Sequence, residues 1–282
     1  MGAERLFFLQ YGAERVSKNL SLAGGPHHLY WEPLIGALVE TTEGWVLLDT
    51  GMSRAAHQDE ANTAAYREGC RGAGNEATPW HLYPPAPDDA FTWGKGGDPM
   101  ATALAEVGLR PEDLALAAVS HLHVDHSGGI PALARAGVPV AIQRRELDFA
   151  RSGAVGVADG FFAPDWSEPG TTWRILDDEE ELAPGVTALS TPGHTPGHQS
   201  FRIDLPRTGV WILSGDAADL GQNFLDDVAC GSCAGGTAAD ERNAAESVRT
   251  LLETARRADA RLIPGHDQLV FNAVRHPAGG HR

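Results

Sequence analysis

One stretch of the chain constrains its fold more than any other, the histidine-rich segment at residues 121–126. It contains His121, His123, Asp125 and His126, and it follows directly after the apolar run at residues 114–120. That run has the length and composition of a buried β-strand. Imidazoles and a carboxylate this closely spaced are ligands that zinc and similar metals accept. The segment therefore predicts a metal site at the end of a buried strand, rather than a cluster of surface histidines.

Further candidate ligands occupy similar positions later in the chain. Strands are expected at residues 186–190, 210–214 and 261–263, and a suitable polar side chain follows each of them. These side chains are His194, Asp216 and His266. Polar groups at the ends of strands gather at one edge of an α/β sheet. The full set is larger than one tetrahedral zinc needs, so the sequence predicts two metal ions that share a carboxylate.

The pattern along the rest of the chain favours a layered α/β fold, because short apolar runs alternate with helical periodicity. Residues 35–40 and 45–49 flank a polar turn and predict a β-hairpin. Residues 100–107 predict a helix, and Asp240 is expected to cap a long helix near the C-terminus. We expect a single domain over residues 1–282. Within it, the proline- and aromatic-rich residues 72–97 are expected to form a long functional loop.

Composition limits the partners and the location that we expect. The chain has 38 acidic and 22 basic residues and a formal net charge of −16, which argues against nucleic acid and anionic lipid as partners. No apolar run is long enough to predict a membrane span, and no signal peptide is evident. Three cysteines do not make a disulfide framework. These features predict a cytoplasmic protein with a small-molecule substrate, and the bias toward arginine favours a bacterial source. The sequence does not predict its oligomeric state, and a homodimer is one of the states it allows.

The order of the motifs resembles that of the metallo-β-lactamase superfamily. His-x-His-x-Asp-His is followed by Thr-Pro-Gly-His, Gly-Asp and Gly-His, and Asp49-Thr50-Gly51 looks like the early Asp-Thr-Gly element of that superfamily. More narrowly, the chain is similar to the N-acyl homoserine lactonases over most of residues 7–267. The resemblance implies a four-layer αβ/βα sandwich, in which two mixed β-sheets are flanked by helices.

The resemblance also implies two sets of metal ligands around one bridging carboxylate, that of Asp216. The first set is His121, His123 and His194. The second set is Asp125, His126 and His266. Asp49 and His198 would hold ligands in position without binding a metal themselves. Two divalent ions are expected, and they would be zinc or, with the same donors, iron or manganese.

The implied reaction is the opening of a lactone, such as an N-acyl homoserine lactone, or of a related small acyl ester. A hydroxide that bridges the two metal ions would attack the carbonyl carbon, and Asp125 would pass a proton to the leaving oxygen. Quorum quenching would follow from such a reaction. One alternative is a thioesterase or glyoxalase-like hydrolase, and another is an iron-dependent oxidoreductase with the same ligand cage.

The walls of the site are expected to separate the two hydrolase hypotheses. A lactonase of this kind calls for an apolar acyl groove, for which Phe7, Trp31 and the aromatic residues of 80–93 are candidates. A thioesterase for glutathione or coenzyme A conjugates calls for clustered basic residues. The pair Arg144-Arg145 is expected on a helix surface instead, which favours the lactonase.

One position departs from the lactonase pattern. These lactonases carry a tyrosine three residues after the bridging aspartate, and this chain has Asp219 there. Asp219 either faces the site, where it would bind a cationic or hydroxylated group of the substrate, or caps the next turn. The missing hydroxyl could come from another tyrosine, and the candidates are Tyr30, Tyr66 and Tyr83.

A second feature of the expected site is the pair Cys230 and Cys233, in a glycine-rich loop near the mouth of the pocket. No second C-x-x-C accompanies the pair, so half of a zinc knuckle is not expected. The loop also lacks the strand-to-helix context of a thioredoxin motif. A structural role is therefore expected for both cysteines.

Overall fold

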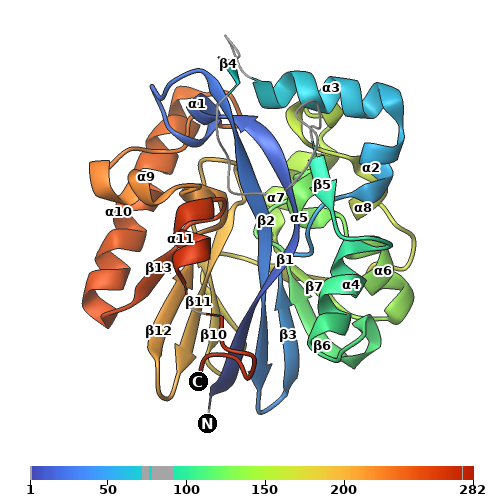
Figure 1. The fold of residues 1–282 in the computed structure, drawn as a ribbon, viewed down its shortest axis with the longest axis vertical. Helices are drawn as coiled ribbons and strands as arrows, with labels where there is room; N and C mark the ends of the chain where they lie inside the picture. The colour runs from blue at the N-terminus through green and yellow to red at the C-terminus, as the bar shows by residue number, and fades with distance from the viewer. Residues whose placement is uncertain (1, 72–75, 78–91, 275) are drawn as a thin grey trace.

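The computed structural model describes residues 2–71, 76–77, 92–274 and 276–282. Two β-sheets face each other at the centre of the molecule (Figure 1). The larger sheet contains, in spatial order, β5 (Thr92–Gly94), β1 (Ala3–Ser17), β2 (His28–Thr41), β3 (Gly44–Leu48), β6 (Leu114–Ala118), β7 (Val140–Gln143) and β8 (Trp173–Leu176), and β4 (Glu76–Ala77) pairs with β2. The smaller sheet contains β13 (Arg261–Ile263), β12 (Gly209–Leu213), β11 (Gln199–Leu205), β10 (Val186–Ser190) and β9 (Glu180–Ala183).

Helices cover the outer face of each sheet. The larger sheet packs against α4 (Pro99–Glu106), α6 (Ile130–Ala136) and α7 (Arg144–Arg151), and the smaller sheet packs against α9 (Gly221–Asp226) and α10 (Ala238–Ala258). The other α-helices of the described residues are α1 (Lys18–Ser21), α2 (Arg54–Gln58), α3 (Glu60–Arg71), α5 (Val124–Ser127), α8 (Ala163–Trp166) and α11 (Gln268–Ala273). Both sheets mix parallel and antiparallel pairs. The expected four-layer αβ/βα sandwich is therefore confirmed.

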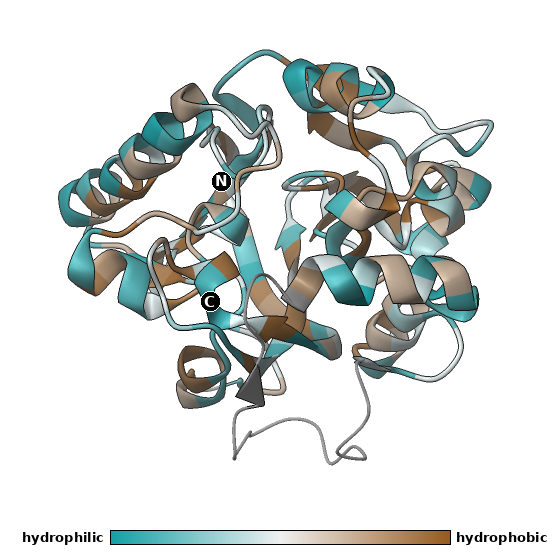
Figure 2. Ribbon diagram, turned by 90° about the horizontal axis from the view of Figure 1, so that it is seen from above, coloured by the Kyte–Doolittle hydropathy of each residue, from teal (hydrophilic) through white to brown (hydrophobic). Residues whose placement is uncertain are grey.

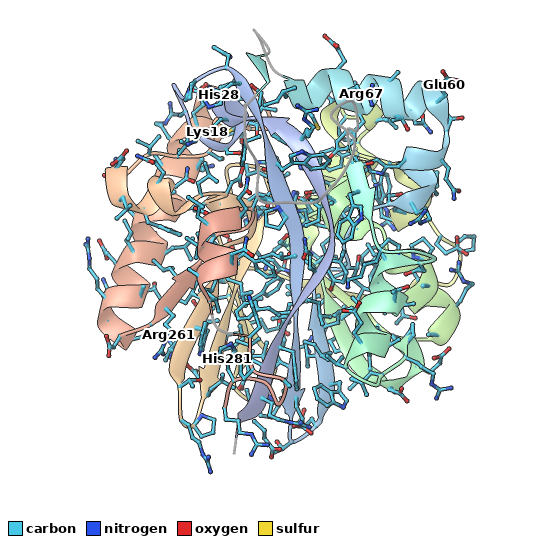
Figure 3. The ribbon with its side chains drawn as sticks, in the orientation of Figure 1. Lys18, His28, Glu60, Arg67, Arg261 and His281 are labelled. Atoms are coloured by element: carbon cyan, nitrogen blue, oxygen red, sulfur yellow. The ribbon has the colours of Figure 1, made fainter. Side chains whose placement is uncertain are left out.

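Alternation along the central strands explains why the layers form. Ile35 and Val39 of β2 point into the core between the two sheets, whereas Leu38 points into the core beneath the helices. Successive side chains of a strand point to opposite faces, so a strand buried on both faces is apolar throughout. Side chains fill the space between the sheets (Figure 3). Helix α10 instead alternates hydrophilic and hydrophobic residues, which is typical of a helix buried on one face (Figure 2).

Most of the expected elements are present, with some differences at their ends. The hairpin of β2 and β3 is confirmed, although β2 begins earlier than expected, at His28. The prediction that Asp240 caps α10 is wrong, because Thr237 is the N-cap residue. Asp240 completes a capping box instead, since its carboxylate accepts a hydrogen bond from the backbone N–H of Thr237 at 3.1 Å.

The expected loop at residues 72–97 lies mostly outside the described residues. Its described parts include the short strands β4 and β5, which extend the larger sheet. Among the described residues, no helix is both long enough and apolar enough to cross a membrane.

Candidate metal centre

The predicted site residues meet at one edge of the sandwich. β6 runs parallel to β3, and β12 runs parallel to β13, so the carboxyl ends of each pair lie together. The loops that follow these strands, together with the loop after β10, carry the predicted metal ligands. All of the predicted ligands are buried except His123, which is half-buried. The topology therefore collects side chains that are up to 145 residues apart in the chain, from His121 to His266.

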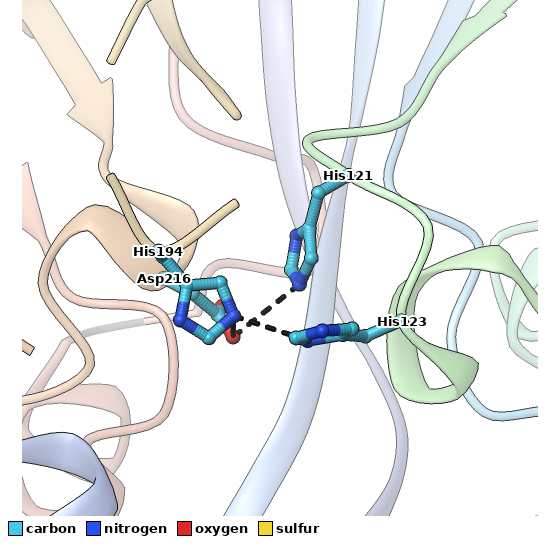
Figure 4. A group of neighbouring side chains, drawn as sticks. All are labelled: His121, His123, His194 and Asp216. Carbon is cyan, nitrogen blue, oxygen red and sulfur yellow. Dashed lines mark hydrogen bonds and ion pairs between the residues drawn. The ribbon is translucent and has the colours of Figure 1, made fainter. Parts of the chain in front are cut away.

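The first group of side chains contains His121, His123, His194 and Asp216, whose candidate ligand atoms all lie within 4.8 Å of one another (Figure 4). Nε2 of His194 is 3.0 Å from Nδ1 of His123. The same Nε2 atom is 3.3 Å from Oδ2 of Asp216. Nε2 of His121 is 3.6 Å from that carboxylate oxygen. Three imidazoles thus surround one oxygen of Asp216.

The second group contains Asp125, His126, His266 and again Asp216. Nε2 of His126 is 3.1 Å from Oδ2 of Asp125 and 3.1 Å from Oδ1 of Asp216. Nε2 of His266 is 3.1 Å from the same Oδ1 atom. Asp216 therefore turns Oδ2 toward the first group and Oδ1 toward the second, as a carboxylate shared by two cations would.

The donor atoms of both groups fit divalent metal ions. Imidazole nitrogens and carboxylate oxygens are the ligands of zinc and of neighbouring transition metals. Nε2 of His121 is buried and has no hydrogen-bond partner, although buried polar atoms normally have one. A metal ion coordinated at this point would satisfy that atom.

The two groups differ in the charge of their histidines. Burial, reinforced by His126, lowers the pKa of His121 well below its ordinary value. Burial, reinforced by His194, lowers the pKa of His123 to about 3. Burial acts the same way on His126 and His266, but the neighbouring carboxylates outweigh it and raise the pKa of both well above the ordinary value. The first group therefore offers neutral imidazoles, whereas a metal ion in the second group would displace protons.

Asp49 and His198 lie behind the two groups. Oδ2 of Asp49 is 3.1 Å from Nδ1 of His126, and its Oδ1 accepts a hydrogen bond from the backbone N–H of Ser120 at 2.6 Å. His198 contacts Asp216 through Nε2, which accepts the backbone N–H of Asp216 at 3.0 Å. Gly215, just before Asp216, has a φ of +53°, and a Cβ there would lie 2.9 Å from Nε2 of His198. A glycine is therefore required for this close approach.

Glu146 is a buried residue of the site that sequence reasoning missed. Oε1 of Glu146 accepts the backbone N–H of Leu122 at 3.0 Å, and Oε2 accepts the backbone N–H of Gly197 at 3.1 Å. The carboxylate thus joins the loop of the histidine cluster to the loop that carries His194 and His198. Burial raises the pKa of Glu146 to about 7. No local pattern reveals this role, because both partners are backbone groups far away in the sequence.

A cavity of about 350 Å³ opens onto both groups, and Asp219 lines it. Asp219 is buried, with 6% of its surface exposed. Burial, reinforced by Asp216, raises the pKa of its carboxyl group well above the ordinary value. The alternative that Asp219 caps the next turn is wrong. At the start of α9, Oδ1 of Asn223 accepts the backbone N–H of Leu220, and Oδ2 of Asp267 accepts that of Gly221.

The walls of the cavity differ from the expected apolar groove. Phe7 and Trp31 do not line it. Phe7 packs on Trp45 with ring centroids 6.0 Å apart, and Trp31 is 1% exposed within the core. The prediction of an acyl groove at these two residues is therefore wrong, since β1 and β2 turn their side chains into the packed layers. Of the remaining aromatic candidates, residues 80–91 lie outside the described residues, and Trp93 is not among the lining residues.

Two of the three candidate tyrosines lie beside this cavity. Tyr66 lines it, and its hydroxyl donates to Oε2 of Glu14 at 3.0 Å. The hydroxyl of Tyr30 donates to Oε2 of Glu32 at 2.7 Å. Tyr83 lies outside the described residues. Both described hydroxyls are therefore engaged by carboxylates that sequence reasoning did not single out.

The loop of Cys230 and Cys233 contacts the first group. The carbonyl oxygen of Ser232 is 3.1 Å from Nδ1 of His194, and Cys233 lines the cavity. Both cysteines are free thiols, and a hydrogen bond that Cys230 donates to Cys233, together with burial, raises the pKa of Cys230 well above its ordinary value. The loop thus contacts a candidate ligand through Ser232, and a structural role for the two cysteines stays a prediction.

Comparison with known proteins identifies the class of protein that this fold and site define. The family model of the metallo-β-lactamase superfamily matches residues 37–266. The chain belongs to this superfamily. Together with the relatives below, this membership makes it a metal-dependent hydrolase.

Within the superfamily, the similarity lies with the N-acyl homoserine lactonases. The chain is 31% identical to an N-acyl homoserine lactonase of Bacillus cereus, over 95% of this chain and 94% of the relative. It is 32% identical to N-acyl homoserine lactonase AttM of Azorhizobium caulinodans, over 57% of this chain and 61% of the relative. A solved N-acyl homoserine lactone hydrolase, with its product N-hexanoyl-L-homoserine at the catalytic metal center, matches with a TM-score of 0.76 and 28% identity, over 98% of both chains.

Proposed function

We propose that this chain is a dinuclear metal-dependent hydrolase that opens a lactone or a closely related small acyl ester. The observation that carries the proposal is that the two oxygens of the Asp216 carboxylate face different groups of ligands. Oδ2 lies among three imidazoles, and Oδ1 lies between His126 and His266. Two ions held by these residues would lie at the floor of a cavity that a small substrate can enter. The lactonase relatives support the choice of substrate class.

The metal ions are proposed to be zinc, held by the two groups of ligands around Asp216. When bound, they would polarise the carbonyl group and lower the pKa of water in the site. His121, His123 and His194 would hold the first ion. Asp125, His126 and His266 would hold the second.

Asp125 is proposed to handle the proton of the reaction. It lines the cavity, and its Oδ2 atom lies 3.1 Å from Nε2 of His126 and 3.5 Å from Nε2 of His266. Burial alone would raise its pKa, but these imidazoles outweigh burial and lower it to about 2. An ionised Asp125 carboxylate beside the cavity could take up a proton and return it to the leaving alkoxide.

The cavity wall argues against thioesters of large anionic cofactors. No lysine or arginine lies among the described residues that line the cavity. Arg144 and Arg145, the nearest basic pair in the sequence, lie exposed on α7, where Arg144 pairs with Asp177 at 3.0 Å. A phosphate-bearing or glutathione-like group would find no lysine or arginine among the described residues of this wall.

The proposed function is tested by pH-stat hydrolysis with the zinc-loaded protein. The screen compares homoserine lactones of several chain lengths with unsubstituted lactones, simple acyl esters, thioesters and a β-lactam. We expect ring opening of a lactone, together with two zinc ions per chain by elemental analysis. Hydrolysis of a thioester with no lactone or ester turned over would contradict the proposal, as would one zinc ion in a fully active protein. An Asp216→Asn variant serves as the negative control.

A further inference from the structure

Two glutamates face each other across neighbouring strands at the wall of the cavity. Glu14 of β1 pairs in register with Glu32 of β2, and both line the cavity. They are 2% and 4% exposed. Like charges directly opposite each other in an antiparallel pair are destabilising, and burial increases the cost. Protons compensate the pair where burial raises the pKa of both carboxyl groups, and a bound cation would compensate it when both are ionised.

Asp219 adds a third carboxylate to the same wall. It lines the cavity with Glu14 and Glu32, and Glu32 interacts electrostatically with both of the others. Oδ1 of Asp219 is buried and has no hydrogen-bond partner. Buried polar atoms normally have a hydrogen-bond partner, and this oxygen has none among the described residues.

The surrounding hydrogen bonds hold the glutamates in place, while burial raises the pKa of both carboxyl groups, that of Glu32 to about 7. The Tyr66 hydroxyl donates to both oxygens of Glu14, at 3.1 and 3.0 Å, and the Tyr30 hydroxyl donates to Oε2 of Glu32. No lysine or arginine lines the cavity among the described residues. The imidazole of His266 lies close by, with its Nδ1 3.9 Å from Oε1 of Glu32. That ring also contacts Asp216 and the carbonyl oxygen of Pro33.

We propose that Glu14, Glu32 and Asp219 form a recognition site for a protonated amine of the substrate, next to the ester or lactone that is cleaved. An ammonium group has three N–H donors and one positive charge, which match the three carboxylates and the unpartnered Oδ1 atom of Asp219. The proposal rests on the proposed function and deepens it, because it makes the substrate an amino-substituted lactone or ester rather than a purely apolar one.

The test uses substrates that differ only at the far end of the acyl chain. 6-Aminohexanoyl homoserine lactone and heptanoyl homoserine lactone have the same number of heavy atoms, but only the first carries an ammonium group. We expect the zinc-loaded protein to favour the first in kcat/KM by tenfold or more, the effect of about one charge-assisted hydrogen bond. Asp219→Asn should remove most of this preference while the two zinc ions stay bound.

Two more variants keep the test decisive. Glu14→Gln changes a residue of β1 and keeps an acceptor for the Tyr66 hydroxyl. It should also reduce the preference, and it replaces Asp219→Asn as the test if that variant does not fold. Asp159→Asn is the matched control, since Asp159 lines the same cavity but is exposed and accepts the backbone N–H of Gly156. It should leave the preference within about twofold of the unmodified protein.

A binding measurement supplies a readout that does not depend on hydrolysis. Hexylammonium and 1-hexanol are also matched in heavy atoms, and calorimetry should show tighter binding of hexylammonium, lost in Asp219→Asn. Equal binding of the two, or equal cleavage of the two lactones, would overturn the amine site and leave the proposed function standing. A third bound zinc ion that Asp219→Asn removes would likewise overturn it in favour of an inorganic cation. If neither lactone nor any ester is cleaved, the proposed function itself fails.

Discussion

The backbone N–H of Asp216 donates a hydrogen bond to Nε2 of His198 at 3.0 Å. Nε2 must therefore be unprotonated, and the proton of the ring lies on Nδ1, which is 2.9 Å from Oγ1 of Thr191. Burial, reinforced by His194, lowers the pKa of His198 to about 3, so the ring stays neutral at physiological pH. His198 thus holds the backbone of the shared carboxylate without contacting a metal position.

The first prediction concerns His198. We expect His198→Ala to weaken metal binding by roughly 10- to 100-fold, the usual cost of losing a residue that positions a ligand. The reason is that the substitution leaves the N–H of Asp216 unpaired and lets the carboxylate move. Competition with a fluorescent chelator measures the affinity. His27→Ala, at an exposed histidine, is the control, and equal affinity in both variants would contradict this role.

The second prediction concerns Asp49 and the second metal group. An asparagine can still accept the N–H of Ser120, but its amide would not stabilise a proton on Nδ1 of His126 as the carboxylate does. We expect Asp49→Asn to weaken binding of the second ion by about 10-fold or more and to spare the first. Stepwise zinc titration by calorimetry separates the two events. Asp177→Asn, at an exposed ion pair, should bind both ions normally. Equal weakening of both binding steps in Asp49→Asn would show that Asp49 does not act through His126.

The third prediction concerns Asp125. We expect Asp125→Asn to lower kcat for lactone hydrolysis by at least about 100-fold, because an amide does not accept the proton that the leaving oxygen requires. The midpoint of thermal unfolding should change far less, since the amide keeps the size of the side chain. Activity is compared only in samples shown to hold the same number of metal ions. A fully loaded variant with an unchanged rate would rule out the proton-transfer role.

The fourth prediction concerns stability and pH. Burial raises the pKa of Asp165 from 3.8 to about 7, although Ser53 and Ser127 donate to its carboxylate. Between those pH values the unfolded chain binds fewer protons than the folded chain, so this group's contribution is complete below pH 3.8 and is lost as pH rises through about 7. Asp165→Asn does not titrate. It should therefore gain up to about 4 kcal/mol in unfolding free energy relative to the unmodified protein between pH 4 and pH 8.

Urea denaturation at several pH values, with chelator present to remove metal effects, measures this difference. Asp148→Asn on the exposed face of α7 is the control and should follow the unmodified protein. If Asp165→Asn shows the same pH dependence as that control, the buried carboxyl group does not titrate as described.

Local sequence determined the layered fold and the positions of the candidate ligands. Strands such as β10 and β13 begin and end where their apolar runs do, because hydrophobic alternation acts over neighbouring residues. The candidate ligands follow such strands, and parallel strands bring their carboxyl ends to one edge. The order of the motifs therefore indicated the family. Every residue of the two groups that the structure brings together was predicted from the sequence.

Only the tertiary structure decided what surrounds that site. Glu14 and Glu32 look like ordinary polar residues of two strands, and only their register places them opposite each other. Glu146 acts through backbone groups of two distant loops, and Asp219 lines the cavity while other side chains accept the N–H groups at the start of α9. Such contacts depend on the packing of elements that are far apart in the chain. The metal ligands were thus readable from local spacing, whereas the chemistry of the cavity wall, and with it the substrate, was set by long-range register and packing.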